Sequence, residues 1–318
     1  VAELVPGGGY VTRLLSKIVG PMGHVYAVNM PTLNERFKTG VNPIIGIEGY
    51  FAPQGRRERG PVDFGAPSLD DESMDSAGRG RYNYTHMTMW AADNTGLHNL
   101  FRLSSLASIE GYYYQPRMDW ELLQRHSEGI IATSGCLGGH VLQKMLKGDV
   151  SGAESDAARL QDIFGKDNFF IEIQDHGIAE QHQTNPQLIE LAKKIGAPLL
   201  ATNDTHYTHR EDHEAHDALL CVQTGCTIAD PNRFKFEGTE HYLKSAQEMR
   251  YLFREVPAAC DNTLWIAERA EIDIPFGNST IPTFGSYLPA NHLLLSILVL
   301  KFYVAPNPLL AIVLANAL

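Results

Sequence analysis

The sequence predicts an α/β protein built on a parallel sheet or barrel. Strand-like and helix-like segments alternate along residues 34–284, as in a chain of βα units. Polar and ionisable residues recur just after the strand candidates, where such folds collect functional groups. The 318 residues are 44% hydrophobic and 20% charged, which is typical of a chain that buries a sizeable core.

Each predicted element has its own signal. Short apolar or alternating runs predict strands at residues 43–48, 85–89, 129–133, 169–173 and 198–202. Apolar residues on one helical face predict helices at residues 97–108, 153–164, 186–195 and 212–222. Pro186 and Gly196 are the start and stop signals of the third helix. Residues 55–81 are rich in Gly, Asp, Ser and Arg and predict a flexible surface loop.

The first 33 residues differ in character from the rest of the chain. Strand candidates at residues 1–4 and 23–29 flank a helix candidate at residues 10–19, and Gly7, Gly8 and Gly9 form the first turn. Glycines here would let backbone N–H groups approach a ligand, but an ordinary tight turn is the simpler explanation of the glycines alone. The segment resembles the first βαβ unit of a class I S-adenosylmethionine (SAM) methyltransferase. Because one such unit cannot enclose a cofactor, SAM is not an expected cofactor of the chain.

Residues 285–318 form an apolar tail to which the sequence assigns no role. The apolar runs 292–305 and 309–318 are separated by a Pro-Asn-Pro interruption. Each run is shorter than the roughly 20 residues that a membrane-spanning helix needs, so no membrane span is expected.

Composition narrows the classes of function. A net charge of −11 and an isoelectric point near 5.6 argue against a Lys/Arg-coated protein that wraps nucleic acid. A DNA substrate stays open, because bound metal ions can supply local positive charge. The four cysteines lack the spacing of a disulfide framework, and we expect a reducing, cytoplasmic setting.

Five ionisable residues lie in or just after strand candidates: Glu48, His86, Cys136, Asp204 and His206. Converging from different strands, they would give a mixed O, N and S ligand set suited to zinc or another borderline divalent ion. Each also has a simpler explanation, such as a helix-capping carboxylate, a surface charge or a small buried thiol. Their joint placement favours the metal site.

Four histidines, namely His206, His209, His213 and His216, fall at helix-compatible intervals. Three of them could share one helix face with Asp212 or Glu214 as a separate metal site, although a solvated polar helix face explains the same residues.

Six segments occur in a fixed order and at characteristic spacing. Five of them read PIIGIEGYFAP (43–53), YTHMTMWAADNTGLHNLFRLSS (84–105), IIATSGCLGG (130–139), NFFIEIQDHG (168–177) and LLATNDTHYTHREDHEAHDALLCVQTG (199–225), and the sixth runs on to WIAE (265–268). Together they resemble the PHP phosphoesterase-type domain of bacterial DNA polymerase III alpha subunits, over about residues 38–284. The resemblance implies a distorted (β/α)7 barrel holding divalent metals, zinc or manganese.

Carried over position by position, the resemblance assigns Glu48, His86, Cys136, Asp204 and His206 as metal ligands, with Asp204 and His206 as catalytic residues. It places His176 near the mouth of the site. The implied activity is metal-dependent 3'–5' exonuclease or phosphoesterase proofreading in DNA replication. The implied partners are the DNA primer terminus and other replicative polymerase subunits.

The family's initial His-x-His strand, further His and Asp-His pair have no counterpart before Glu48. An incomplete barrel with impaired activity is therefore expected, with a non-catalytic structural module of the polymerase as the alternative. We predict three regions: a methyltransferase-like fragment (1–33), a PHP domain lacking its first strands (34–284) and the tail (285–318). A fusion of unrelated pieces, or a misjoined reading frame, would explain this organisation.

Overall fold

The computed structural model describes residues 2–4, 26–28, 44–59 and 84–273. Near the amino terminus, β1 (Ala2–Leu4) pairs in parallel with β2 (Tyr26–Val28). These are the two strands predicted for the first segment. The helix predicted between them, the Gly7–Gly9 turn and the tail lie outside the described residues.

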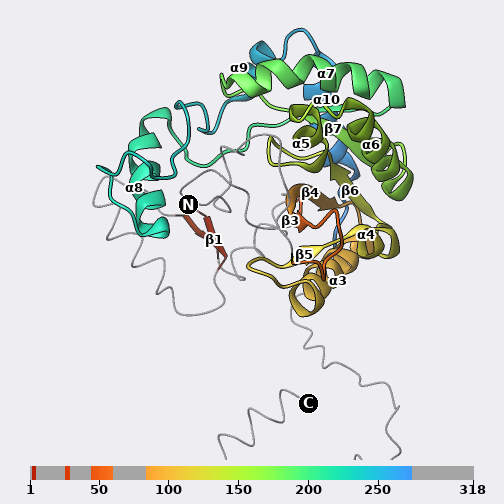
Figure 1. Ribbon diagram of the computed structural model, residues 1–318. Coiled ribbons are helices and arrows are strands. Elements are labelled where there is room, and N and C mark those ends of the chain that lie inside the picture. The colour runs from red at the N-terminus through yellow and green to blue at the C-terminus, as the bar shows by residue number, and fades with distance from the viewer. Residues whose placement is uncertain (1, 5–25, 29–43, 60–83, 274–318) are drawn as a thin grey trace, which may run out of the picture. The chain divides into compact units, whose positions relative to one another are not determined.

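The main sheet contains six strands in the order β5-β3-β4-β6-β7-β8 (Figure 1). Their bounds are β3 (Gly46–Phe51), β4 (Thr85–Ala91), β5 (Arg117–Met118), β6 (Ile130–Thr133), β7 (Phe169–Ile173) and β8 (Leu199–Ala201). The α/β class is confirmed, and β6, β7 and β8 are mutually parallel as predicted. The sheet is mixed and not parallel throughout, because β4 is antiparallel to both β3 and β6. Among the described strands, β5 and β8 form open edges, so the barrel is not closed.

The two faces of the sheet carry different residues, because successive side chains of a strand point to opposite faces. In β4 the buried residues Met87, Met89 and Ala91 alternate with half-buried His86, Thr88 and Trp90. The first three belong to the main hydrophobic core, whereas Trp90 packs in a separate small cluster. His86 and Thr88 therefore lie on the face turned away from the main core.

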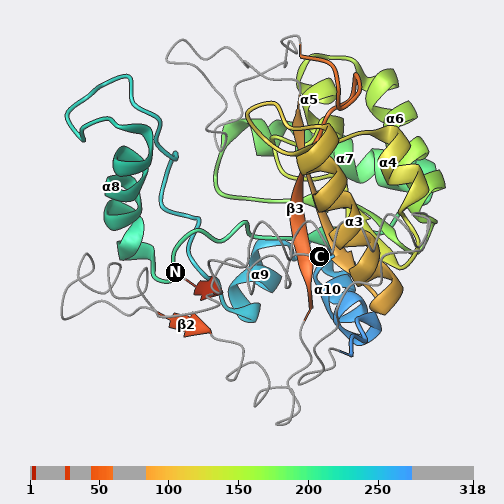
Figure 2. The ribbon, with the colours of Figure 1, turned by 90° about the horizontal axis from the view of Figure 1, so that it is seen from below.

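Helices α3 (Asn94–Glu110), α4 (Trp120–Arg125), α5 (His140–Leu146), α6 (Val150–Phe164) and α7 (Ala179–Ile195) contribute to the main core and cover that face (Figures 1 and 2). Asp93 caps α3 by accepting a hydrogen bond from the Gly96 amide at 2.8 Å. The prediction that a helix starts at Pro186 is wrong, because α7 begins at Ala179 and includes this proline. The first turns of α7 are mainly polar, and buried Gln181 and Thr184 hold them without an apolar stripe.

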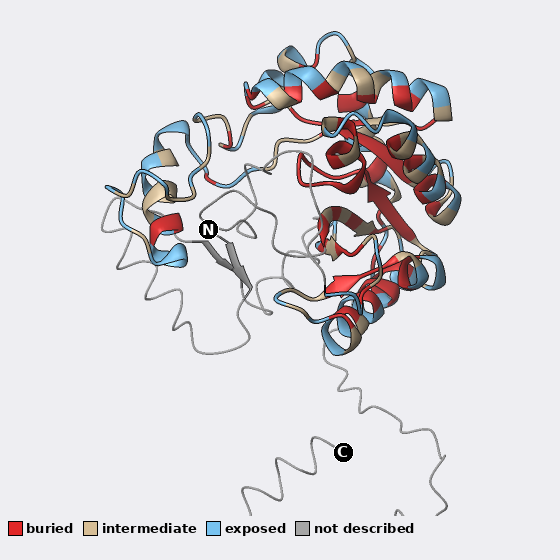
Figure 3. Cartoon of the chain, in the orientation of Figure 1, coloured by how far each residue is buried: buried red, intermediate tan, exposed pale blue. Residues whose placement is uncertain are grey.

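The remaining helices are η1 (Arg210–Asp212), α8 (His213–Thr224), α9 (Ala246–Leu252) and α10 (Pro257–Arg269). In α8 only Leu220 and Cys221 are buried, and Figure 3 shows most of this helix as exposed or half-buried. In contrast, Ile266 of α10 is buried in the small cluster with Ile131, Phe170 and Leu200. Helix α10 thus covers the apolar part of the face that carries His86.

Residues 55–59 depart from the predicted flexible loop. The Arg56 side chain is 5% exposed and pairs with Asp119 at 2.8 Å and with Glu110 at 2.7 Å. These ion pairs tie the segment after β3 to the start of α4 and the end of α3. The rest of the predicted loop, residues 60–81, lies outside the described residues. Within the described part of the chain, no helix combines the length and hydropathy needed to cross a membrane.

Candidate metal centre

The candidate site lies at the end of the sheet where the carboxyl ends of the parallel strands β6, β7 and β8 meet. Cys136 follows β6, His176 follows β7 and Asp204 follows β8, so these residues leave the carboxyl ends of three parallel strands. His86 is at the start of β4, which runs antiparallel to β6, and therefore reaches the same end. The structure thus brings together residues that the sequence predicted to converge.

Glu48, His86 and Cys136 form the first of two clusters of possible metal ligands. Their ligand atoms all lie within 4.8 Å of one another. Glu48 is opposite Thr88 in the ladder between β3 and β4, so it lies diagonally across from His86 on the same face. Its Oε1 atom is 3.0 Å from His86 Nδ1.

Close backbone packing brings the Cys136 loop against β4. Gly135 has φ 84°, in the left-handed region that favours glycine, and a Cβ atom there would lie 2.8 Å from the His86 carbonyl oxygen. The His86 amide donates to the Gly138 carbonyl oxygen at 3.0 Å. The glycines around Cys136 therefore allow its thiol to reach the cluster.

Asp204, His206 and His241 form the second cluster, again with ligand atoms within 4.8 Å of one another. Asp204 has φ 41°, a left-handed conformation that is uncommon for a residue other than glycine and recurs at functional sites. The Asp204 carbonyl oxygen lies 2.8 Å from His206 Nδ1. Because a carbonyl only accepts, Nδ1 carries the proton and Nε2 is left as the atom that could bind a metal.

The two clusters are electrostatic neighbours. The hydrogen bond from His86 lowers the pKa of Glu48, and His206 of the second cluster adds to this effect. Burial raises the pKa of Asp204, and the nearby Glu48 raises it further. Carboxylates from both clusters therefore repel one another, and a bound cation would relieve that repulsion.

Glu172 of β7 interacts electrostatically with Glu48 and Asp204, one residue of each cluster, and was missed by the sequence analysis. It is 4% exposed, and the hydroxyl groups of Thr133 and Thr202 donate to its carboxylate. Burial raises its pKa, with further contributions from Asp204 and Glu48. The sequence does contain a signal for this residue, because a single glutamate interrupts the apolar strand FFIEI.

His176, predicted near the mouth of the site, is only 2% exposed. Its Nδ1 lies 2.9 Å from the Gln181 amide nitrogen, and its Nε2 lies 2.8 Å from the Asn203 carbonyl oxygen. Both ring nitrogens are thus engaged by protein groups. The His176 ring stacks on the His241 ring, with ring centroids 3.9 Å apart, and so packs against the second cluster.

His241 was also missed by the sequence analysis. It lies in a stretch without helical or strand periodicity, 35 positions beyond His206, so only the fold reveals its proximity. The ring is fully buried, and burial lowers its pKa to about 3, with His176 and His206 acting in the same direction. At neutral pH the imidazole is uncharged, which is the form that binds metals.

The histidine site predicted on one helix face is not formed, because His206 and His209 precede α8. His213 and His216 line a cavity of about 420 Å³ together with Tyr207, Arg233 and Phe236.

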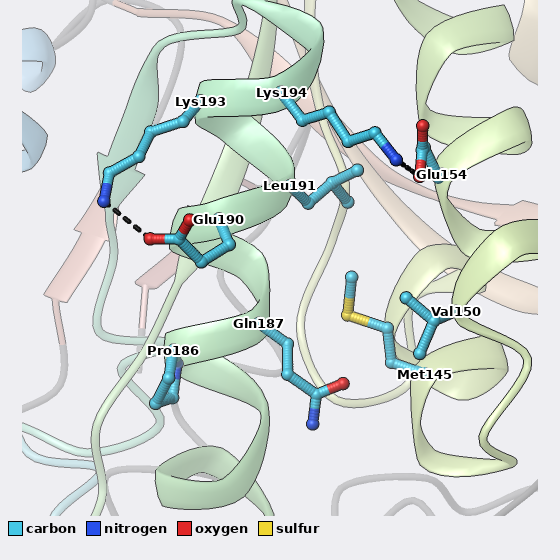
Figure 4. Close-up of a pocket in the computed structure, with 9 residues that line it drawn as sticks. All are labelled: Met145, Val150, Glu154, Pro186, Gln187, Glu190, Leu191, Lys193 and Lys194. Atoms are coloured by element: carbon cyan, nitrogen blue, oxygen red, sulfur yellow. Dashed lines mark hydrogen bonds and ion pairs between the residues drawn. The ribbon is translucent and has the colours of Figure 1, made fainter.

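A second cavity of about 680 Å³ lies among α5, α6 and α7 (Figure 4). Lys193 pairs with Glu190 along α7, and Lys194 pairs with Glu154 of α6, each at 2.6 Å. None of the residues that line this cavity is a predicted site residue.

Residues 24–176 match the PHP domain family. The chain contains a PHP domain. It is also similar to DNA polymerase III subunit alpha of Mycobacterium leprae (strain TN), with 42% identity over 296 residues that cover 92% of this chain and 25% of that protein. The corresponding subunit of Saccharopolyspora erythraea is 50% identical over 240 residues, which cover 74% of this chain and 20% of that protein. In Treponema pallidum the identity is 43% over 245 residues.

The PHP domain is therefore homologous to a part of these polymerase subunits, and the chain spans about a quarter or less of their length. The family match begins at residue 24, inside the segment predicted to resemble a methyltransferase. The alignment with the M. leprae subunit also covers more of the chain than residues 34–284 contain. The expected likeness to a methyltransferase is not supported by these similarities.

Proposed function

We propose that this PHP domain is a metal-dependent phosphodiesterase module of a replicative DNA polymerase, acting with impaired activity on the 3' end of DNA as a proofreading exonuclease. The observation that carries the proposal is the pair of ligand clusters at one sheet edge, Glu48–His86–Cys136 and Asp204–His206–His241. The five predicted ligands and Glu172 bring carboxylate, imidazole and thiol groups to one place, which fits zinc or manganese.

The residues present can perform three tasks in such a reaction. The two clusters would hold the ions, and the buried Glu172 links β6, β7 and the end of β8 next to them by accepting hydrogen bonds from Thr133 and Thr202. His86 stabilises the ionised form of Glu48 and so keeps it available as a ligand. A divalent ion bound here supplies Lewis-acid polarisation of a phosphoryl oxygen and lowers the pKa of water. Its charge would also attract DNA to a protein with a net charge of −11.

Nuclease assays test this proposal. The chain would be incubated with primer-template DNA labelled at the 3' end, in Mn²⁺, Zn²⁺ or chelator. We expect metal-dependent release of the terminal nucleotide, reduced at least about 100-fold by Asp204→Asn, since even supporting residues of metal sites contribute 10–100-fold. Asp162→Asn, an exposed acid of α6, is the matched control and should retain activity. Absence of release with every metal would favour the second candidate, a non-catalytic module that braces the polymerase.

The proposed setting rests on the homology to polymerase subunits: a cytoplasmic protein whose partners are DNA and other replicative subunits. Binding of SAM at Gly7–Gly9 is a lesser candidate that rests on the glycine turn alone. It requires saturable binding of the cofactor by the whole chain.

A further inference from the structure

His241 is a buried imidazole whose ring nitrogens make no hydrogen bond of standard geometry within the described part of the protein, although the Asp204 backbone lies close enough to offset in part the lowering of its pKa by burial. It is 0% exposed, and neither Nδ1 nor Nε2 has a partner at hydrogen-bond geometry there. Leaving a buried polar group without a partner lowers the stability of a fold. A histidine that served only to fill space would therefore be a poor choice at this position.

The backbone holds His241 firmly beside Asp204 and His206. The segment around His241 pairs with the loop after β8: the His206 amide donates to the His241 carbonyl oxygen at 2.9 Å, and the Leu243 amide donates to the Tyr207 carbonyl oxygen at 3.0 Å. Asn203 Nδ2 also donates to the Tyr242 carbonyl oxygen at 2.6 Å. The position of the ring is thus fixed by the same loop that carries the two predicted ligands.

The rings packed around His241 complete this arrangement. His176 stacks beneath it, with ring planes 15° apart. Phe236 closes another side, with its ring centroid 4.8 Å from that of His241 and 4.5 Å from that of His206. Because His176 already uses both of its nitrogens, His241 is the ring of this stack that can offer a lone pair. Aromatic packing orients it without occupying those atoms.

We propose that His241 is a metal ligand, and that Asp204, His206 and His241 bind a divalent cation of their own beside the Glu48–His86–Cys136 cluster. The inference deepens the proposed function and rests on it. One carboxylate and two imidazoles form a set that accepts zinc, manganese or iron(II). The neighbouring cluster differs in containing a thiolate. The two ions can therefore be told apart by spectroscopy.

Cobalt(II) titration of the metal-free chain makes this distinction, because only the ion bound to Cys136 gives a thiolate-to-cobalt charge-transfer band. We expect the wild type to bind two cobalt equivalents. His241→Gln should lose the equivalent without that band, or bind it at least about tenfold more weakly. Asp204→Asn should show the same loss, and combining the two substitutions should cost no further equivalent. Cys136→Ser should lose the charge-transfer band together with the equivalent that gives it and should keep the other equivalent. Exposed His98→Gln is the matched control.

An independent readout uses the wild type with isotope-labelled histidine. On addition of zinc, the ring-nitrogen resonances of His241 should shift together with those of His206. Full cobalt binding by His241→Gln, or an unshifted His241 resonance in zinc-loaded wild type, would overturn the role of His241 and leave the proposed function intact. Wild type that binds no cobalt would overturn the proposed function as well.

Discussion

Glu172 is an electrostatic neighbour of Glu48 and Asp204, and its burial raises the pKa of its carboxyl group. The pH dependence of the stability follows from how many protons the folded and unfolded states bind. Between the ordinary value of 4.5 and the raised pKa, the folded state binds more protons than the unfolded state. The stability of the metal-free protein should therefore fall as the pH rises through that range.

Replacing Glu172 by glutamine should remove this dependence while keeping the contacts with Thr133 and Thr202. We expect metal-free Glu172→Gln to gain stability relative to wild type as the pH increases above 4.5. A difference of one unit in pKa corresponds to about 1.4 kcal/mol. Thermal unfolding in chelator across the pH range measures this. If the stabilities of the two proteins changed with pH in the same way, the raised pKa of Glu172 would be contradicted.

Sequence reasoning at the residue scale found the ligands that follow strands, and it missed those whose position depends on tertiary structure. Cys136 and Asp204 come directly after β6 and β8, so strand pattern alone placed them at one edge. His241 reaches the site only because its segment pairs with the loop after β8. No local pattern near residue 241 indicates that pairing.

The loop between β6 and α5 depends on glycine at a point where another strand approaches. Gly135→Ala would combine a left-handed backbone with a Cβ atom 2.8 Å from the His86 carbonyl oxygen. Gly148 has a similar φ of 80°, but its Cβ position is open, so Gly148→Ala isolates the backbone cost of about 1–2 kcal/mol.

Denaturant unfolding should show a larger loss of stability for Gly135→Ala than for Gly148→Ala. Metal affinity should fall only in Gly135→Ala, because the displaced loop carries Cys136. Equal losses in both variants would mean that the loop tolerates displacement from β4.

The segment after β3 is tied to two helices by one buried guanidinium group. Arg56→Met should destabilise the protein by about 3 kcal/mol, because Asp119 would be left with an uncompensated charge in a largely buried position. Arg57 also contacts Glu110, but its side chain is 72% exposed. Arg57→Met is therefore expected to change the free energy of unfolding by no more than about 0.5 kcal/mol. Chemical denaturation compares the two, and similar losses would refute the buried role of Arg56.

At the scale of elements, periodicity was informative where one face is buried. The strand predicted at residues 169–173 coincides with β7, and α6 begins three residues before its predicted start. The first turns of α7 were missed because their buried residues are polar. The antiparallel β4 was missed because alternation does not reveal strand direction.

For the molecule as a whole, the candidate ligands extend from Glu48 to His241 and come from β3, β4 and three separate loops. No short peptide of this chain contains either cluster, so metal binding requires the folded sheet. This dependence explains why family resemblance, rather than spacing, supplied the most specific prediction from sequence. It also means that metal content reports directly on whether the PHP domain keeps its site.

The most direct test is the metal content of the purified full chain, measured by elemental analysis beside Cys136→Ala, Asp204→Asn and the exposed-acid control Asp162→Asn. We predict stoichiometric zinc or manganese in wild type and control. Each cluster variant should lose part of this metal, and the combined variant should lose all of it. Wild-type protein with no metal above background, or cluster variants that retain the wild-type content, would contradict the proposed metal centre.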